Sequence, residues 1–243
     1  GGAVLILEES TLESNSAGDA GGGVFATNGA RIQVIGGKSS SIKNNKAMTG
    51  TGSGGGVYVQ QVDSCLDVSG TGTKLVVKDN TASDSGGGMY ASTGSTFIVS
   101  SGGQLSVTNN MAKKGGGILL VKDGTRLDIS GTGTKLVVKD NTASNSGGGL
   151  YAHLAAAIVV ASGGQMTVAK NTAKNNGGGV FLFSEGTRFD VIDSHSRLFI
   201  NDNIAQEKNG GGIAIVAGAV VRVTSPSTFY GNTAAKGSGG GLA

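Results

Sequence analysis

The feature that most constrains this chain is a triple glycine that recurs at nearly even spacing along the whole sequence. The triplets begin at Gly21, Gly54, Gly86, Gly115, Gly147, Gly177, Gly210 and Gly239, so neighbouring copies are 29 to 33 residues apart. A fixed period of this length is typical of solenoids and other repeat arrays, in which each unit packs only against its neighbours. We therefore expect residues 1–243 to form a single elongated array.

Three short apolar stretches accompany each triplet, for example residues 89–91, 97–99 and 105–107. In each stretch apolar and variable residues alternate, which predicts a strand with one buried face. Three strands and three turns fill about 30 residues, whereas a propeller blade needs four strands and ~40 or more residues. The prediction is an all-β fold, a right-handed parallel β-helix of about seven full rungs with three short strands per rung of about 30 residues, stacked at ~4.8 Å.

A longer duplication supports this prediction. Residues 66–91 recur almost unchanged as residues 127–152, with the substitutions Val68/Ile129, Asp84/Asn145 and Met89/Leu150. The copied block spans two repeats. Copying of this kind favours the building of an array over the building of one unique site.

Composition excludes several functional classes. The net charge is only +3, and no run of Lys and Arg is long enough to bind nucleic acid. No apolar run reaches the ~20 residues of a membrane-spanning helix. Cys65 is the single cysteine, which rules out an intrachain disulfide, and we expect it to be a buried, inert thiol.

Both ends of the sequence fall inside a repeat. Residues 1–4, Gly-Gly-Ala-Val, look like the tail of another copy, and the chain closes on the triplet at Gly239. A solenoid normally needs polar capping repeats for solubility. We therefore expect this chain to be a segment of a longer protein.

One asparagine precedes each glycine triplet by five to nine residues, with alanine two positions after it and an apolar residue three positions before it. These residues are Asn15, Asn45, Asn80, Asn110, Asn141, Asn171, Asn203 and Asn232. In a β-helix they would stack at one corner, with each amide bonding to the next and to buried turn backbone. We expect a structural ladder rather than catalytic groups.

The central residue of the strand after the glycines is usually large and apolar. This position holds Phe25, Tyr58, Tyr90, Leu119, Tyr151, Phe181 and Ala214. If the flanking residues point inward, these side chains point outward and form a stripe along the rod. The stripe either stiffens the sheet by cross-strand packing or provides a contact face for a partner, and the second possibility makes it our hypothetical binding surface.

The residues that could support catalysis are scattered. Asp67, Asp128 and Asp190 are predicted to lie two rungs apart, whereas glycoside hydrolysis needs a carboxylate pair within ~5–9.5 Å. His153 and His195 stand alone, with no carboxylate or serine motif that would make either of them part of a catalytic triad. Gly50-x-Gly52-x-x-Gly55 matches a phosphate-binding pattern, but it does not lie between a strand and a helix as that pattern requires. We expect no enzymatic activity, cofactor or metal site.

The repeat signature resembles a known family. Phe229-x-x-Asn232 and the opening Gly-Gly-Ala-Val match the FxxN and GGA[ILV] repeats of the chlamydial polymorphic membrane proteins, and looser copies cover essentially the whole chain. Most copies here have Val or Leu in place of Phe, and GGG in place of GGA. The resemblance implies the β-helical passenger of a surface autotransporter that acts in adhesion.

From these observations we expect a non-enzymatic adhesion or scaffold segment, at the cell surface or secreted, that binds a protein partner or a host or cell-surface receptor. The alternative is a structural subunit docked through the stripe into a larger assembly, for instance in an algal or protist compartment, where similar repeats also occur. A polysaccharide lyase or hydrolase is the third possibility.

Overall fold

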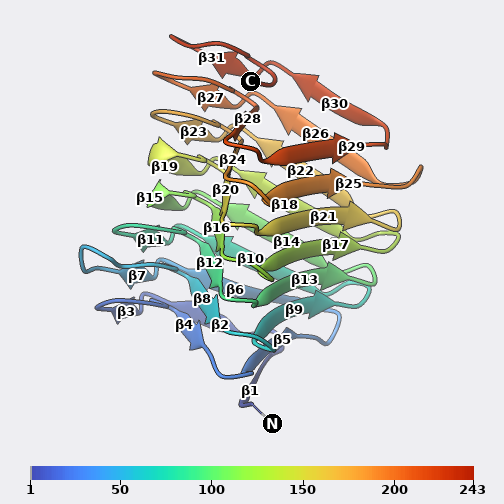
Figure 1. Cartoon of the computed structure of the whole chain (residues 1–243). Helices are drawn as coiled ribbons and strands as arrows, with labels where there is room; N and C mark the ends of the chain where they lie inside the picture. Colours follow the sequence, from blue (N-terminus) through green and yellow to red (C-terminus); the bar gives the residue numbers. More distant parts are fainter. Residues whose placement is uncertain (1) are drawn as a thin grey trace.

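The computed structural model describes residues 2–243, so Gly1, the first residue of the predicted repeat remnant, lies outside the described residues. Residues 2–243 contain thirty-one short strands and no helix. Every pairing between these strands is parallel, and the chain winds upward so that equivalent strands of successive turns lie above one another (Figure 1). This arrangement confirms the predicted parallel β-helix.

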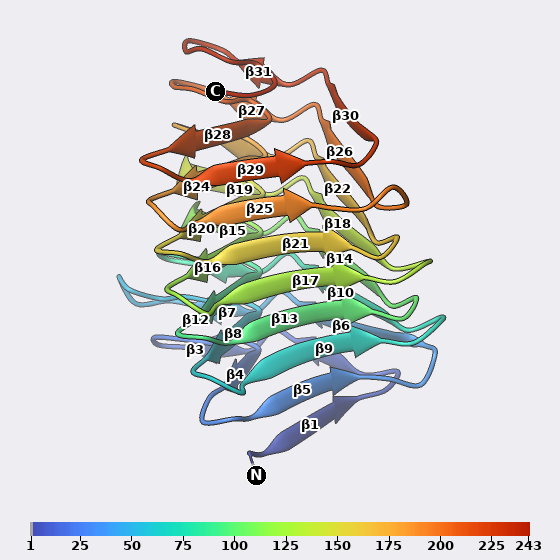
Figure 2. The same ribbon diagram turned by 45° about the vertical axis from the view of Figure 1, so that its right-hand side comes forward.

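The strands form four sheets, which we name A to D. Sheet A, which faces the viewer in Figure 2, contains β1 (Val4–Leu7), β5 (Arg31–Val34), β9 (Cys65–Ser69), β13 (Thr96–Ser100), β17 (Arg126–Ser130), β21 (Ala157–Ala161), β25 (Arg188–Val191) and β29 (Val220–Val223). Sheet B contains β2 (Thr11–Glu13), β6 (Ser39–Lys43), β10 (Lys74–Lys78), β14 (Gln104–Thr108), β18 (Lys135–Lys139), β22 (Gln165–Ala169), β26 (Arg197–Asn201) and β30 (Ser227–Tyr230). 

Sheet C contains β3 (Ser16–Ala17), β7 (Lys46–Ala47), β11 (Thr81–Ala82), β15 (Met111–Lys114), β19 (Thr142–Ser146), β23 (Thr172–Ala173), β27 (Ile204–Ala205) and β31 (Thr233–Ala234). Sheet D follows the glycine triplets and contains β4 (Val24–Ala26), β8 (Val57–Gln60), β12 (Met89–Ser92), β16 (Ile118–Val121), β20 (Leu150–His153), β24 (Val180–Phe183) and β28 (Ile213–Val216). One turn of the chain passes through D, A, B and C in that order.

The prediction of three strands per rung was wrong, because sheet C adds a fourth. Most of its strands have two residues, as in β11, where Thr81 points outward and Ala82 is buried. Two residues are too short to display an alternating pattern, and the Asn-Thr-Ala sequence has the composition of a turn. The three predicted strands correspond to sheets D, A and B.

The core follows from the alternation along each strand. In sheet A, Leu66, Phe97 and Leu127 are fully buried and stack in register on successive rungs. A single cluster of such side chains runs through the rod, with the alanines Ala47, Ala82 and Ala112 of sheet C forming a small separate cluster. Burial of apolar surface contributes about 25 cal/mol per Å², so each rung is stabilised mainly by its contacts with the rungs above and below.

Each glycine of a triplet is required for a different structural reason. Gly86 has a φ of +61°, a conformation that strains residues with a Cβ. A Cβ on Gly87 would overlap the carbonyl oxygens of Met111 and Gly116 in the next rung, and one on Gly88 would lie 2.9 Å from the Asn110 amide nitrogen. At the triplet the backbones of neighbouring rungs therefore lie too close together to leave room for a Cβ.

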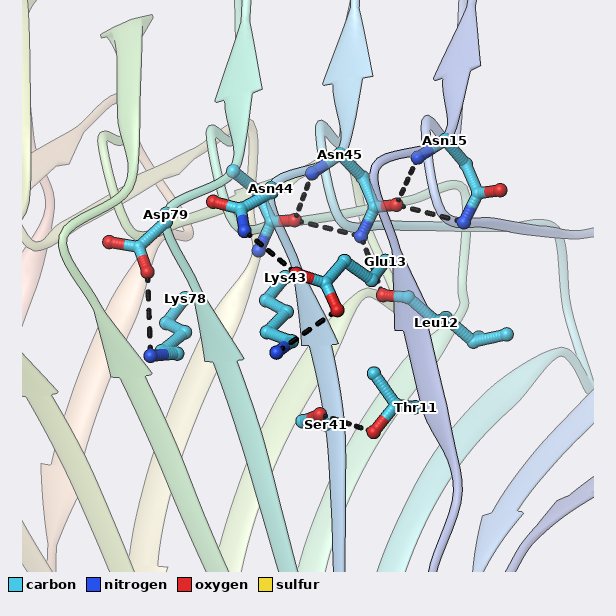
Figure 3. A network of polar contacts seen from close by, with 11 residues as sticks. Thr11, Leu12, Glu13, Asn15, Ser41, Lys43, Asn44, Asn45, Lys78 and Asp79 are labelled. Atoms are coloured by element: carbon cyan, nitrogen blue, oxygen red, sulfur yellow. Dashed lines mark hydrogen bonds and ion pairs between the residues drawn. The ribbon is translucent and has the colours of Figure 1, made fainter.

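The eight predicted asparagines stack at the corner between sheets B and C. Six of them, from Asn45 to Asn203, are buried, whereas Asn15 is exposed and Asn232 is half-buried. Figure 3 shows the pattern: the backbone N–H and side-chain amide of Asn15 both donate to Asn45 Oδ1, at 2.9 and 3.0 Å. The Asn45 amide in turn donates to the carbonyl of Leu12. Each rung thus satisfies buried polar groups of the rung before it.

Candidate binding face

The outer side of sheet D carries two parallel columns of side chains, which together we call the sheet D face. The first, the aromatic column, consists of Phe25, Tyr58, Tyr90, Leu119, Tyr151, Phe181 and Ala214, all paired in register. The second, the flanking column, consists of Gln60, Ser92, Val121, His153, Phe183 and Val216. The columns are adjacent because side chains two residues apart on a strand point to the same side.

The first three rings of the aromatic column stack face to face. The ring centroids of Phe25 and Tyr58 are 5.2 Å apart with an interplanar angle of 10°. Those of Tyr58 and Tyr90 are 4.6 Å apart at 5°. The spacing is close to the distance between parallel strands, so the sheet itself holds these rings in contact.

A second aromatic group lies further along the rod and mixes the two columns. Tyr151 meets Phe181 edge-on, with ring centroids 5.1 Å apart, and Phe181 lies parallel to Phe183 at 6.1 Å. The His153 ring lies 4.9 Å from that of Phe183. These contacts make the face continuous between rungs.

Exposure along the aromatic column is uneven, which corrects the expectation of a continuous exposed stripe. Phe25 is 50% exposed, whereas Leu119 and Phe181 are only 4% and 7% exposed and Ala214 is buried. The reason is coverage by neighbours: Tyr151 and Phe183 pack against Phe181, and the shorter Leu119 lies in register between the larger Tyr90 and Tyr151. Tyr58, Tyr90 and Tyr151 are half-buried and remain available for contact.

Leu119 interrupts the aromatic column between Tyr90 and Tyr151. A hollow of about 170 Å³ lies at this point, lined by Ser85, Tyr90, Lys114, Leu119, Val121, Tyr151 and His153. The sequence pattern did not predict the hollow, because Ser85 and Lys114 come from the segments that lead into the glycine triplets. His153 and Val121 could have been found from their period-2 relation to Tyr151 and Leu119.

The burial of the tyrosines in the aromatic column affects the pKa values of their phenols. Burial, together with the nearby Tyr90, raises the pKa of Tyr58 to about 12. Burial likewise raises the pKa of Tyr90 and of Tyr151. All three phenols therefore keep their protons, and their hydrogen-bond donors, at neutral pH.

His153 is positioned by its neighbours in the next rung. Its Nδ1 lies 3.2 Å from Ser184 Oγ and 3.3 Å from the carbonyl oxygen of Phe183. Ser184 Oγ also accepts a hydrogen bond of 2.8 Å from the backbone N–H of Leu154. This serine hydroxyl is thus used in connecting two rungs. His195 lies apart, in the turn between sheets A and B, where its Nδ1 is 3.2 Å from Ser194 Oγ.

The three aspartates considered for catalysis lie on the outer side of sheet A, two rungs apart as predicted. Asp128 pairs with Arg126 at 2.8 Å. Asp190 lies between two arginines, 3.4 Å from Arg188 and 3.3 Å from Arg222. Within residues 2–243, no group of three or more His, Cys, Asp or Glu side chains is placed to hold a metal ion.

Cys65 departs from its prediction, because it is half-buried on the outer side of sheet A rather than in the core. It occupies the position two residues before Asp67 at which Asp128 and Asp190 have an arginine. Among the described residues, Asp67 Oδ1 is accordingly a buried oxygen with no hydrogen-bond partner. Burial raises the pKa of the Cys65 thiol, an effect that Asp67 reinforces and Arg31 opposes.

Comparison with known proteins identifies the class to which this architecture belongs. Residues 68–243, most of the chain, match the family described as "Right handed beta helix region". The chain therefore belongs to the right-handed β-helix family, in agreement with the predicted handedness.

More specific comparisons add little. No curated protein matches the chain. A crystal structure of a hyper-glycosylated TibA fragment, modified by TibC, is 17% identical over 98% of both chains, with a TM-score of 0.18. That score is too low to bear on the fold or function of this chain. Within residues 2–243 no helix has the length and apolar character to cross a membrane.

Proposed function

We propose that this chain is a non-enzymatic scaffold β-helix that binds a protein partner, such as a receptor at a cell surface, through the sheet D face. The observation that carries the proposal is the run of partly exposed aromatic side chains in register along that sheet. Aromatic residues are enriched at protein interfaces, and contiguous exposed apolar patches are uncommon on monomers.

The other outer faces have a different character. On sheet B, the strand ends carry the exposed lysines Lys74 and Lys135. On sheet A, Asp128 and Asp190 are engaged in ion pairs with arginine. Sheet B also exposes Phe199, Phe229 and Tyr230, but the rings that contact one another in register on successive rungs lie on sheet D.

A binding role also agrees with the chemistry that the outer residues offer. A polysaccharide hydrolase or lyase would use carboxylates to transfer protons or to act as a nucleophile. Here the carboxylates of Asp128 and Asp190 are engaged in ion pairs with arginine, an arrangement that suits surface structure better than catalysis. We infer that the chain does not catalyse cleavage of a polysaccharide.

The resemblance to the repeats of the polymorphic membrane proteins supports a cell-surface or secreted location and a role as an adhesin. The likeness lies in the asparagine corner and the glycine triplet of each repeat. Both are structural features of the β-helix. An alternative function uses the same face differently: a subunit of a larger assembly would bury the sheet D face permanently. The length of the face over successive rungs is the observation that favours this alternative.

Adhesion can be tested with beads coated with the purified chain and counted on cultured cells. Replacing Tyr58, Tyr90 and Tyr151 together with serine should reduce adhesion at least about tenfold, because aromatic anchors carry much of the energy of an interface. The matched control replaces Val76, Val137 and Phe199, which point outward on sheet B, with serine. Circular dichroism must show that both variants keep the β-helix.

Unchanged adhesion by the tyrosine variant, or equal loss in both variants, would contradict the proposal. The assembly alternative predicts a different result, in which the native protein elutes in a stoichiometric complex and the tyrosine variant releases it. A wild-type chain that elutes alone from its native source would count against the assembly.

A further inference from the structure

We propose that the hollow above Leu119 is a receptor site for one aromatic ring, carried by a partner segment that has an acidic residue next to the ring. The inference deepens the proposed function and rests on it, since the hollow lies in the sheet D face. It assigns the kind of side chain that the face recognises and the rung at which it does so.

The first observation that supports a ring as the occupant is the distance between the side chains of the aromatic column. Leu119 pairs in register with Tyr90 on one side and with Tyr151 on the other, so these tyrosines are two rungs apart. Two rungs correspond to about 9.6 Å, and a ring midway would lie ~4.8 Å from each tyrosine. The rings already stacked in this column are separated by 4.6 and 5.2 Å. An incoming ring would therefore continue the existing stack.

The size and floor of the hollow fit the same occupant. Its volume is about 170 Å³. An apolar cavity of about 150 Å³ in another protein is enough to bind benzene. Leucine is shorter than tyrosine, so the buried Leu119 fills only the inner part of the gap and lines the hollow from below. Val121, beside it in the flanking column, extends this apolar floor.

The charged side chain at the rim of the hollow indicates the acidic residue next to the ring. Among the residues that line the hollow, Lys114 is the one lysine, and arginine, aspartate and glutamate are absent; Lys114 makes no ion pair with any residue of 2–243. The nearby carboxylate of Asp84 accepts a hydrogen bond from the Ser85 hydroxyl at 2.9 Å. Asp84 does not line the hollow, so charge complementarity with Lys114 favours a carboxylate beside the incoming ring.

The experiment uses the absence of tryptophan from this chain. Two peptides are titrated with the intact protein and followed by the anisotropy of their own tryptophan: acetyl-Gly-Asp-Trp-Asp-Gly-amide and acetyl-Gly-Asn-Trp-Asn-Gly-amide. Both should bind saturably. The acidic peptide should bind about threefold to tenfold more tightly at low salt, and added salt should remove this preference because it screens the lysine.

Substitutions locate the site. Leu119→Phe, which fills the gap with a ring of its own, should weaken both peptides at least about fivefold. Ile98→Phe places the same ring on the outer side of sheet A and should leave the affinity for both peptides unchanged. Lys114→Gln should make the two peptides bind equally. Should Leu119→Phe fail to fold, Tyr90→Leu and Tyr151→Leu each remove one wall and should each weaken binding.

Several outcomes would overturn the inference. One is the absence of saturable peptide binding at millimolar concentration, and another is undiminished binding to a folded Leu119→Phe variant. Binding of methyl glucoside or methyl glucuronide to the wild type, with no binding of either peptide, would assign the hollow to a sugar ring instead. Adhesion lost in the triple tyrosine variant but retained by Leu119→Phe would reject the hollow while leaving the proposed function standing.

Discussion

Asn171 Oδ1 accepts two hydrogen bonds from Asn141 in the preceding rung, one from its backbone N–H and one from its side-chain amide, both at 3.0 Å. The Asn141 amide also donates to the carbonyl oxygens of Val107 and Lys139. Three neighbouring segments of the chain therefore meet at one buried side chain.

Replacing Asn141 with alanine should lower the free energy of unfolding by about 3–5 kcal/mol, because each buried group left unpaired costs ~1–3 kcal/mol. The backbone N–H of Asn110 would lose its acceptor, Asn141 Oδ1, and the Asn110 amide would keep only its hydrogen bond to the carbonyl of Val77. Urea unfolding measures the change. Asn145→Ala, at an exposed position of the following strand β19, is the control and should cost ~0.5 kcal/mol or less. Equal losses in the two variants would contradict the role of the ladder.

Gly87→Ala should abolish folding or leave an insoluble protein, because its Cβ would overlap the carbonyl oxygens of Met111 and Gly116. Backbone atoms cannot move aside as a flexible side chain can, so the cost exceeds the ~1–3 kcal/mol of ordinary overpacking. Gly50→Ala provides the control, since a Cβ there has nothing within 4 Å. Soluble yield and the circular dichroism of both variants decide the matter, and a soluble, fully folded Gly87→Ala protein would refute the steric argument.

The pKa of Tyr58, which burial raises to about 12, predicts a pH dependence of stability. An unfolded tyrosine titrates near ~10, so the folded chain holds this proton more tightly. The contribution is complete below pH ~10 and is lost as the pH rises from ~10 towards 12. Thermal melts over this range should show a decline that Tyr58→Phe lacks, and ultraviolet absorbance should show one phenol that ionises near pH 12 only in the wild type. Identical titrations would show that the stacked ring is not shielded.

The turn at Asp193 predicts an acid-sensitive contribution. Desolvation raises the pKa of this exposed carboxyl, but hydrogen bonds from the backbone of His195 and from Ser196 outweigh it and lower the pKa to about 2. The stabilisation is present above the unfolded value of ~3.9 and is lost as the pH falls towards 2. Asp193→Asn should therefore be less stable than the wild type at pH 6, with the difference shrinking between pH 4 and 2. A difference that stays constant with pH would contradict this account.

The period of the glycines and the alternation in stretches such as residues 97–99 were enough to predict the stacked architecture. They were also enough to predict the register that aligns Tyr58 with Tyr90. Two-residue strands such as Thr81–Ala82 could not be predicted, because an alternating pattern needs more residues than they have. Alignment of the repeats thus predicts the longer strands of each rung better than the two-residue strands at its corners.

The details of the candidate site were harder to predict than the fold. The position of Leu119 in the aromatic column could be inferred, but its 4% exposure depends on how the side chains of Tyr90 and Tyr151 on either side of it are placed. Lys114 reaches the hollow from a segment of sheet C, and no spacing rule relates it to the column. Side chains that meet at the junction of two sheets are the part that requires coordinates.

The parallel stacking of rungs has a mechanical consequence. The hydrogen bonds between rungs, such as those from Gly86 to Lys114 and from Met89 to Gly117, join one turn of the chain to the next. A pull along the rod therefore loads whole turns in series, and the weakest junction yields first. A pull across the rod is shared by every rung that the load touches. A partner held along the sheet D face would load many rungs at once, so a sideways attachment should resist force far better than one made at a single end.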